Sequence, residues 1–216
     1  MRNLIFPLAI FFIIKSNAHA NRNAFTSPSC FSMGGAGSLF LSVNAQIKNP
    51  AVLNKSRSIT TSIVRYPALI SSQSLDLNFP LDNFAFSSSL KHISYGVFEG
   101  YNENGEDIGS YKSNETWVDG YLSKEMNSYP ILLGSSISLK SANFSSLNIK
   151  TLFTSIGAIG YFKNKNNAVG LSINQIGLKL TDQQISYISP NFISGGSKKL
   201  NYLPAIIYLD FLIEKK

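Results

Sequence analysis

Alternation of apolar with small polar residues, which begins near Ser58, constrains the fold of this chain more than any other sequence feature. Ile137 and Leu139, for example, alternate with Ser136 and Ser138. Only a β-strand places every second side chain on the same face. The same pattern predicts strands at 59–63, 75–79, 84–90, 93–101, 116–123, 131–139, 148–162, 169–173, 179–188 and 204–213. We therefore expect an all-β chain of about ten strands, since no stretch after residue 58 has a helical period.

Clusters of turn-forming residues separate the expected strands. Such residues gather at 102–105, 127–130 and 163–167, and a fourth cluster is Ser194-Gly195-Gly196-Ser197. Asn, Gly, Ser and Pro in short runs between periodic segments mark turns. We expect a chain reversal at each of the four.

The polar face of these strands favours a membrane environment. Charged residues make up 14% of the chain, against about 25% in a typical soluble domain. A transmembrane antiparallel β-barrel turns apolar side chains to lipid and small polar ones to its lumen. The residues expected to face lipid are Ile137, Leu139, Val169, Leu171 and Ile173, and those expected to face the lumen are Ser136, Ser138, Ser172 and Asn174. A secreted β-sandwich is the alternative.

The first twenty residues have the pattern of a secretory signal. Arg2 is followed by the apolar stretch Leu4–Ile14 and by the small-x-small site Ala18-His19-Ala20, which predicts cleavage before Asn21. The expected organisation is therefore a signal peptide at 1–20, a Gly-rich segment at 21–57 and the barrel at 58–216. Loss of the two cations of the signal lowers the formal net charge from +7 to +5, which is too diffuse for a nucleic-acid groove. We expect no nucleic-acid partner.

The sequence predicts no enzyme site, cofactor or metal. His92 is the one histidine after the signal, and no serine lies in a nucleophile-elbow pattern. The acidic run of Glu99, Glu103, Glu106 and Asp107 lacks the residue order of a calcium loop. The glycines at 34–37 lack the preceding strand and following helix of a phosphate loop.

Two motifs carry a family resemblance. The first pairs Met33-Gly34-Gly35-Ala36-Gly37 with Lys48-Asn49-Pro50-Ala51-Val52-Leu53 just before the first expected strand. The second comprises the strand and loop at 93–111 and the passage at 169–177, followed by Leu203-Pro204. This arrangement resembles the PorV/PorQ family of FadL-related outer-membrane barrels. The residues that match the family's plug and entrance motif are Gly34, Gly35, Gly37, Asn49, Pro50, Ala51 and Leu53.

The resemblance implies a fold, a location and partners. The family has a 14-stranded monomeric barrel, with an N-terminal segment packed in or under the lumen. It works in type IX secretion across the bacterial outer membrane, where members shuttle cargo or attach it to the cell surface. The implied partners are outer-membrane lipid, other type IX components and exported cargo proteins. The alternatives are a FadL-like channel for hydrophobic compounds, whose Gly-rich segment serves as a hatch, and a secreted structural or adhesive β-protein.

This chain departs from the family in two respects. Val43 and Asn44 occupy positions where the family usually has an acidic residue. The length after Ser58 allows about ten strands rather than fourteen, so the chain is either a reduced relative or a truncated product. If it closes as a narrower barrel, the first strand at 59–63 and the last at 205–212 should hydrogen-bond to each other, because unpaired strand edges are costly in lipid.

Overall fold

The alternating residues form ten β-strands in a single antiparallel sheet. The computed structural model describes residues 38–39, 48–52, 56–102, 104–145, 147–162, 167–181 and 184–214. The strands are β1 (Ser58–Arg65), β2 (Ser71–Leu81), β3 (Phe84–Tyr101), β4 (Asp107–Glu125), β5 (Ile131–Phe144), β6 (Leu147–Phe162), β7 (Asn167–Thr181), β8 (Gln184–Ile188), β9 (Asn191–Lys199) and β10 (Ile206–Glu214). The all-β prediction and the expected number of strands are confirmed. Nowhere in these ranges does a helix have the length and apolar composition needed to cross a bilayer.

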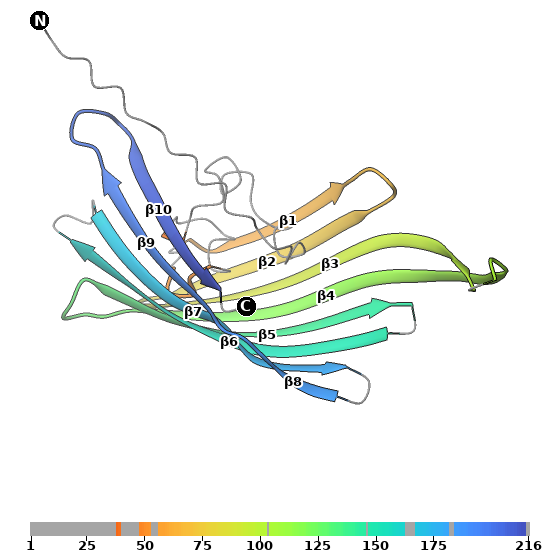
Figure 1. Ribbon diagram of the computed structural model, residues 1–216. Coiled ribbons are helices and arrows are strands. Elements are labelled where there is room, and N and C mark those ends of the chain that lie inside the picture. Colours follow the sequence, from red (N-terminus) through yellow and green to blue (C-terminus); the bar gives the residue numbers. More distant parts are fainter. Residues whose placement is uncertain are drawn as a thin grey trace, which may run out of the picture.

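The strands follow one another as a curved meander. Their order is β1-β2-β3-β4-β5-β6-β7-β9-β10, and β8 pairs with the far end of β7. The sheet bends into a trough, with β1 and β10 at its two rims and the middle strands along its floor (Figure 1). We call the inner surface of the trough the concave face and the outer surface the convex face.

Strands β8 and β9 act as two halves of one interrupted strand. Gly177 pairs with Ile188 and Asn174 pairs with Asn191, so both halves follow the same register along β7. The interruption contains Pro190, which has no N–H to donate to the ladder. Opposite it, Gln175 of β7 has a φ of 64°, which deforms the partner strand at the same level.

Closure between the first and last strands is not observed, and that prediction is wrong. In the described chain β1 and β10 are the two edges of the sheet. The path between them has nine positions, and every neighbouring pair is antiparallel. The first and ninth strands must therefore run parallel to each other. A direct β1–β10 contact would place one parallel pair in an otherwise antiparallel sheet, whereas bacterial single-chain barrels use even strand numbers.

Three other expectations change at the level of single strands. The stretches at 84–90 and 93–101 form one continuous strand, β3, which bends at a register shift between Ser94 and Gly96. The expected turn at 194–197 lies in the middle of β9, where Gly195 pairs with Gly170. The strand expected at 179–188 is divided between the end of β7 and β8.

The core is thin and lies between the sheet and the described part of the N-terminal segment. Leu39, Ala51 and Val52 of that segment pack with Leu132 and Ile159 of the sheet. A second cluster joins Trp117 to Ile93, with Tyr95 packed against it. Both clusters lie on the concave face, so the hydrophobic core of the described chain lies inside the trough.

Candidate functional site

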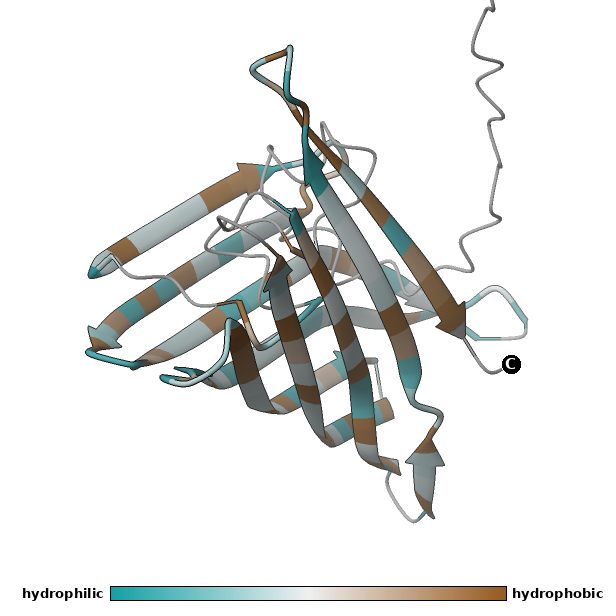
Figure 2. Ribbon diagram, turned by 90° about the vertical axis from the view of Figure 1, so that its left-hand side faces the viewer, coloured by the Kyte–Doolittle hydropathy of each residue, from teal (hydrophilic) through white to brown (hydrophobic). Residues whose placement is uncertain are grey.

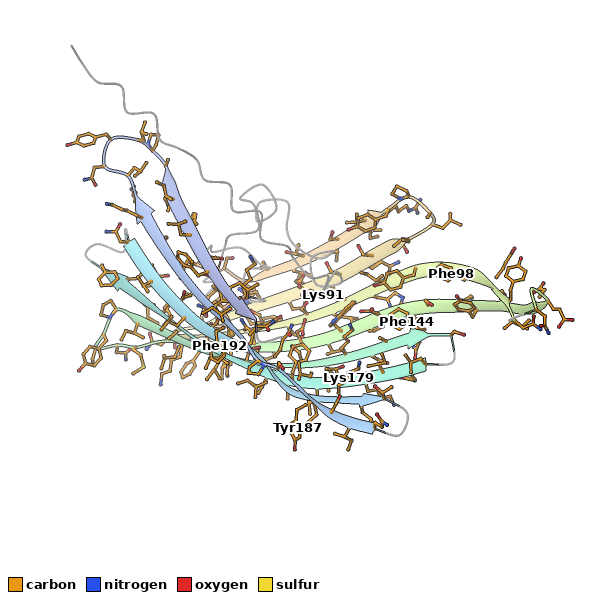
Figure 3. The ribbon with its side chains drawn as sticks, in the orientation of Figure 1. Lys91, Phe98, Phe144, Lys179, Tyr187 and Phe192 are labelled. Atoms are coloured by element: carbon orange, nitrogen blue, oxygen red, sulfur yellow. The ribbon has the colours of Figure 1, made fainter. Side chains whose placement is uncertain are left out.

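The convex face carries a continuous apolar surface. One row of cross-strand partners runs across six strands through Leu75, Leu90, Val118, Leu139, Leu152 and Leu178. Each of these side chains is more than a third exposed. Figure 2 shows the alternation of apolar and polar positions along the strands, and Figure 3 shows Tyr187, the partner of Leu178, projecting from the convex side.

The next row toward the projecting β3–β4 turn is polar from β2 to β6, and it continues through the exposed apolar residues Ile63 on β1, Leu180 on β7 and Ile185 on β8. Its polar members, again cross-strand partners, are Gln73, His92, Thr116, Ser141 and Lys150. On β5 the convex-face positions from Ile131 to Leu139 are apolar except for Ser135, and they give way to Ser141. Nine residues at about 3.3 Å each extend about 30 Å along the strand. At the tilt of about 40° found in membrane barrels, such a stretch would cover about 23 Å, and the apolar height of those proteins is about 25 Å.

The predicted division of the two faces is confirmed. Ile137, Leu139, Val169 and Leu171 are each about half exposed, and Ile173 lies on the same face, half-buried. The four predicted lumen residues are buried on the concave face: Ser136, Ser138, Ser172 and Asn174. The sheet therefore exposes its apolar side and covers its polar side, which is the reverse of a soluble β-protein.

Four charged side chains cross-link the concave face. Lys91 lies 3.5 Å from Asp119, and both side chains are almost fully buried. Lys140 lies 2.8 Å from Glu115, and its ammonium group sits 5.1 Å from the centre of the Trp117 ring. These pairs were not predicted from the sequence. The alternation could have indicated them, because all four charged residues occupy strand positions on the same side as the small polar residues.

Glycines form a track along the floor of the trough. Gly134, Gly157, Gly170 and Gly195 lie on β5, β6, β7 and β9, and Gly134 pairs directly with Gly157 as Gly170 does with Gly195. A Cβ atom at any of them would lie 2.1–2.5 Å from an atom of Ser38, Leu39, Asn49 or Pro50. The N-terminal segment therefore rests on the bare backbone of four strands, which only glycine permits.

Asn49 organises the described turn of that segment. Its Oδ1 accepts a hydrogen bond from the Ala51 amide at 3.0 Å, and its carbonyl accepts one from the Val52 amide at 3.1 Å. Its Nδ2 donates to the Ala158 carbonyl of β6 at 3.5 Å. Of the family-like motif, the structure thus brings Asn49, Pro50 and Ala51 together in a buried turn. Gly34, Gly35, Gly37 and Leu53 lie outside the described residues.

Two further anchors hold the segment. The carbonyl of Lys48 accepts hydrogen bonds from Ser172 Oγ at 2.7 Å and from Asn174 Nδ2 at 2.9 Å. Ser38 donates its amide and its hydroxyl to the carboxylate of Asp210 on β10, at 2.9 and 2.7 Å. Lys48 Nζ lies 4.0 Å from the same carboxylate. The anchors join the segment to both β7 and the edge strand β10.

The β3–β4 hairpin projects beyond the rest of the sheet. The β2 pairing with β3 ends at Ser94, and the β5 pairing with β4 ends at Ser113, so the hairpin between them has no strand on either side (Figure 1). Phe98 and Tyr111 stack across it with ring centres 5.5 Å apart. At its tip, a hydrogen bond to the Glu99 carboxylate raises the pKa of Tyr101.

The structure places the remaining polar candidates in structural roles. His92 Nδ1 lies 2.8 Å from Thr116 Oγ1 on the convex face. Of the acidic run, Glu106 and Asp107 accept hydrogen bonds at the hairpin tip, while Glu103 lies outside the described residues. In the described ranges no three His, Cys, Asp or Glu side chains gather in a way suited to a metal ion.

Comparison of the sequence with known protein families and curated proteins found no match.

Proposed function

We propose that this chain is a non-enzymatic β-sheet protein of the bacterial outer membrane, of the PorV/PorQ type, that takes part in type IX secretion or in attaching cargo to the cell surface. The reversed polarity of the sheet supports the membrane location. Soluble monomers rarely expose apolar patches above a few hundred Å², whereas the convex face exposes apolar side chains on most of its strands. Lipid is the solvent that such a surface fits.

The projecting hairpin supports a role in protein contact. A hairpin without neighbouring strands is marginally stable by itself, and this one exposes Val97, Phe98, Tyr101 and Ile108. Aromatic and apolar side chains at an exposed tip are the residues that protein interfaces bury.

In a membrane, the backbone groups of the two sheet edges would need hydrogen-bond partners. Unpaired N–H and C=O groups cost several kcal/mol each in hydrocarbon, so β1 and β10 require partners there. Because these strands run parallel, only an odd number of further strands between them keeps every pair antiparallel.

Cysteine labelling in membranes tests the location. In a Cys30→Ser background, Ile137→Cys should react with a bilayer-soluble maleimide and not with a membrane-impermeant one. Ser138→Cys, one residue away on the concave face, is the matched control and should escape the bilayer-soluble reagent. Recovery of the protein in the periplasm without detergent, or labelling of Ile137→Cys from water, would refute the membrane location.

A complementation experiment tests the secretion role. Cells that lack the protein should retain cargo bearing type IX sorting signals in the periplasm, and the full chain should restore its delivery to the surface. A variant in which residues 97–112 are replaced by a two-residue turn that joins the paired residues Gly96 and Ser113 should insert normally and fail to restore delivery. Normal cargo delivery in the cells that lack the protein would contradict the role, and full rescue by the short variant would contradict the part assigned to the hairpin.

A further inference from the structure

An apolar groove crosses the convex face between β4 and β8. Its volume is about 430 Å³, and its apolar lining consists of Val118, Leu139, Leu152, Leu178, Leu180 and Ile185. This volume is within the range of sites that bind small molecules, about 300–1,000 Å³. The groove therefore has room for an apolar chain laid against the sheet.

One end of the groove is polar and positively charged on β4, β5 and β6, while Leu180 and Ile185 keep it apolar on β7 and β8. Lys150, Thr116 and Ser141 line the polar part. Lys140 also belongs to the lining, but its ammonium group lies 2.8 Å from the Glu115 carboxylate. Lys150 is exposed, and no carboxylate of the described residues forms an ion pair with it. Its ammonium group is therefore available to an anion whose apolar part lies along Leu152 and Leu178.

We propose that this groove binds one membrane lipid with an anionic headgroup, its acyl chain along the leucines and its phosphate at Lys150. The inference rests on the proposed membrane location and adds a specific ligand to it. Charge selects the lipid class: a lysine at the membrane surface attracts anionic headgroups, with an effect of about fivefold on affinity. Hydroxyls of Thr116 and Ser141 supply further hydrogen-bond donors to phosphate oxygens.

A second cavity on the same face provides an internal comparison. Its volume is about 660 Å³, and it is lined by Leu133, Ile156, Leu171, Phe192 and Ile213 without a lysine or arginine. Like the first groove, this cavity can hold an apolar chain, but it has no positively charged side chain to attract a lipid headgroup. Selectivity for anionic lipid should therefore reside in the groove at Lys150.

Native mass spectrometry of the full chain in detergent tests the proposal. We expect one phosphatidylglycerol to bind about fivefold more tightly than phosphatidylcholine with the same acyl chains. K150Q should abolish this preference, and K150R should keep it. K124Q is the matched control, because Lys124 is also on the convex face but lies 4.9 Å from the centre of the Phe84 ring, away from the groove; it should leave the preference unchanged.

Two further measurements separate the contributions of chain and headgroup. Leu178→Trp, which fills the groove, should weaken both lipids equally, and inorganic phosphate alone should not displace the bound lipid. An unchanged preference in K150Q, or displacement by phosphate, would overturn the proposal. Equal binding of both lipids by a chain that fractionates with the outer membrane would refute this inference alone, whereas selective binding by a chain found in the periplasm would refute the membrane location alone.

Discussion

Substitution of Gly134 by alanine should detach the N-terminal segment from the sheet. The new Cβ atom would lie 2.1 Å from the Pro50 carbonyl oxygen and 2.4 Å from the Ala51 amide nitrogen. The first distance is 1.3 Å shorter than the 3.4 Å at which ordinary contact begins. Both obstructing atoms belong to the backbone, so no change of rotamer can relieve the clash, and the segment itself must move.

Such a movement would strain or break the hydrogen bonds from Ser172 and Asn174 to the Lys48 carbonyl. Overpacking costs about 1–3 kcal/mol, and a buried polar group left without its partner costs about 1–3 kcal/mol more. We therefore expect Gly134→Ala to lower the free energy of unfolding by about 2–5 kcal/mol. Gly157→Ala should cost less, because its new Cβ atom would meet the side-chain oxygen of Asn49 rather than backbone.

Gly160→Ala is the control for this series. Gly160 also lies within a strand, and a Cβ atom there would meet nothing within 4 Å. Alanine should be neutral or stabilise by about 0.5–1 kcal/mol, since glycine weakens a strand. Guanidinium titration followed by the fluorescence of Trp117, the single tryptophan, measures all three variants. Equal unfolding free energies for Gly134→Ala and Gly160→Ala would refute the close approach of the segment.

Three other substitutions test separate parts of the site. Asp210→Ala removes both hydrogen bonds from Ser38, so amide exchange at Ser38 should accelerate about tenfold or more, as loss of about 1–3 kcal/mol predicts; unchanged exchange would contradict the anchor. Lys140→Ala removes the cation 2.8 Å from the buried Glu115 and should destabilise by about 3–5 kcal/mol in denaturant titration, whereas a loss below 1 kcal/mol would show that the pair is dispensable. Phe98→Ala removes a stacked ring and should raise proteolysis of the hairpin while leaving the unfolding free energy of the sheet within about 0.5 kcal/mol; global destabilisation would contradict its independence.

The two faces of the sheet were predictable from the sequence because alternation is a local property. A side chain at Ile137 points away from Ser138 whatever strand lies beside it. The register between neighbouring strands was not predictable in this way. Lys91 meets Asp119 because β3 and β4 pair in one particular register, and the period of either strand alone does not contain that register.

Gly195 and Gly196 show why the turn predicted at 194–197 is a strand in the structure. Glycine is favoured in turns, and it is equally favoured in a strand where another backbone comes close. A Cβ at Gly195 would lie 2.2 Å from the Ser38 hydroxyl oxygen. Glycine is therefore needed at this position because another part of the chain comes close to the strand. Ser38 and Gly195 are far apart in the sequence, and only the folded chain shows that they touch.

The same anchors have a consequence for the order in which the chain folds. The part made first has its partners in the part made last: Asn49 bonds to a strand residue 109 positions later, and Ser38 to one 172 positions later. Contacts of such long range form slowly, because the entropy cost of closing a large loop precedes the favourable free energy of the contacts. Until β5, β6, β7 and β10 have all joined the sheet, the N-terminal segment lacks part of the surface on which it docks. Its docking is therefore a late step in folding and can serve as a marker that the sheet has formed as far as β10.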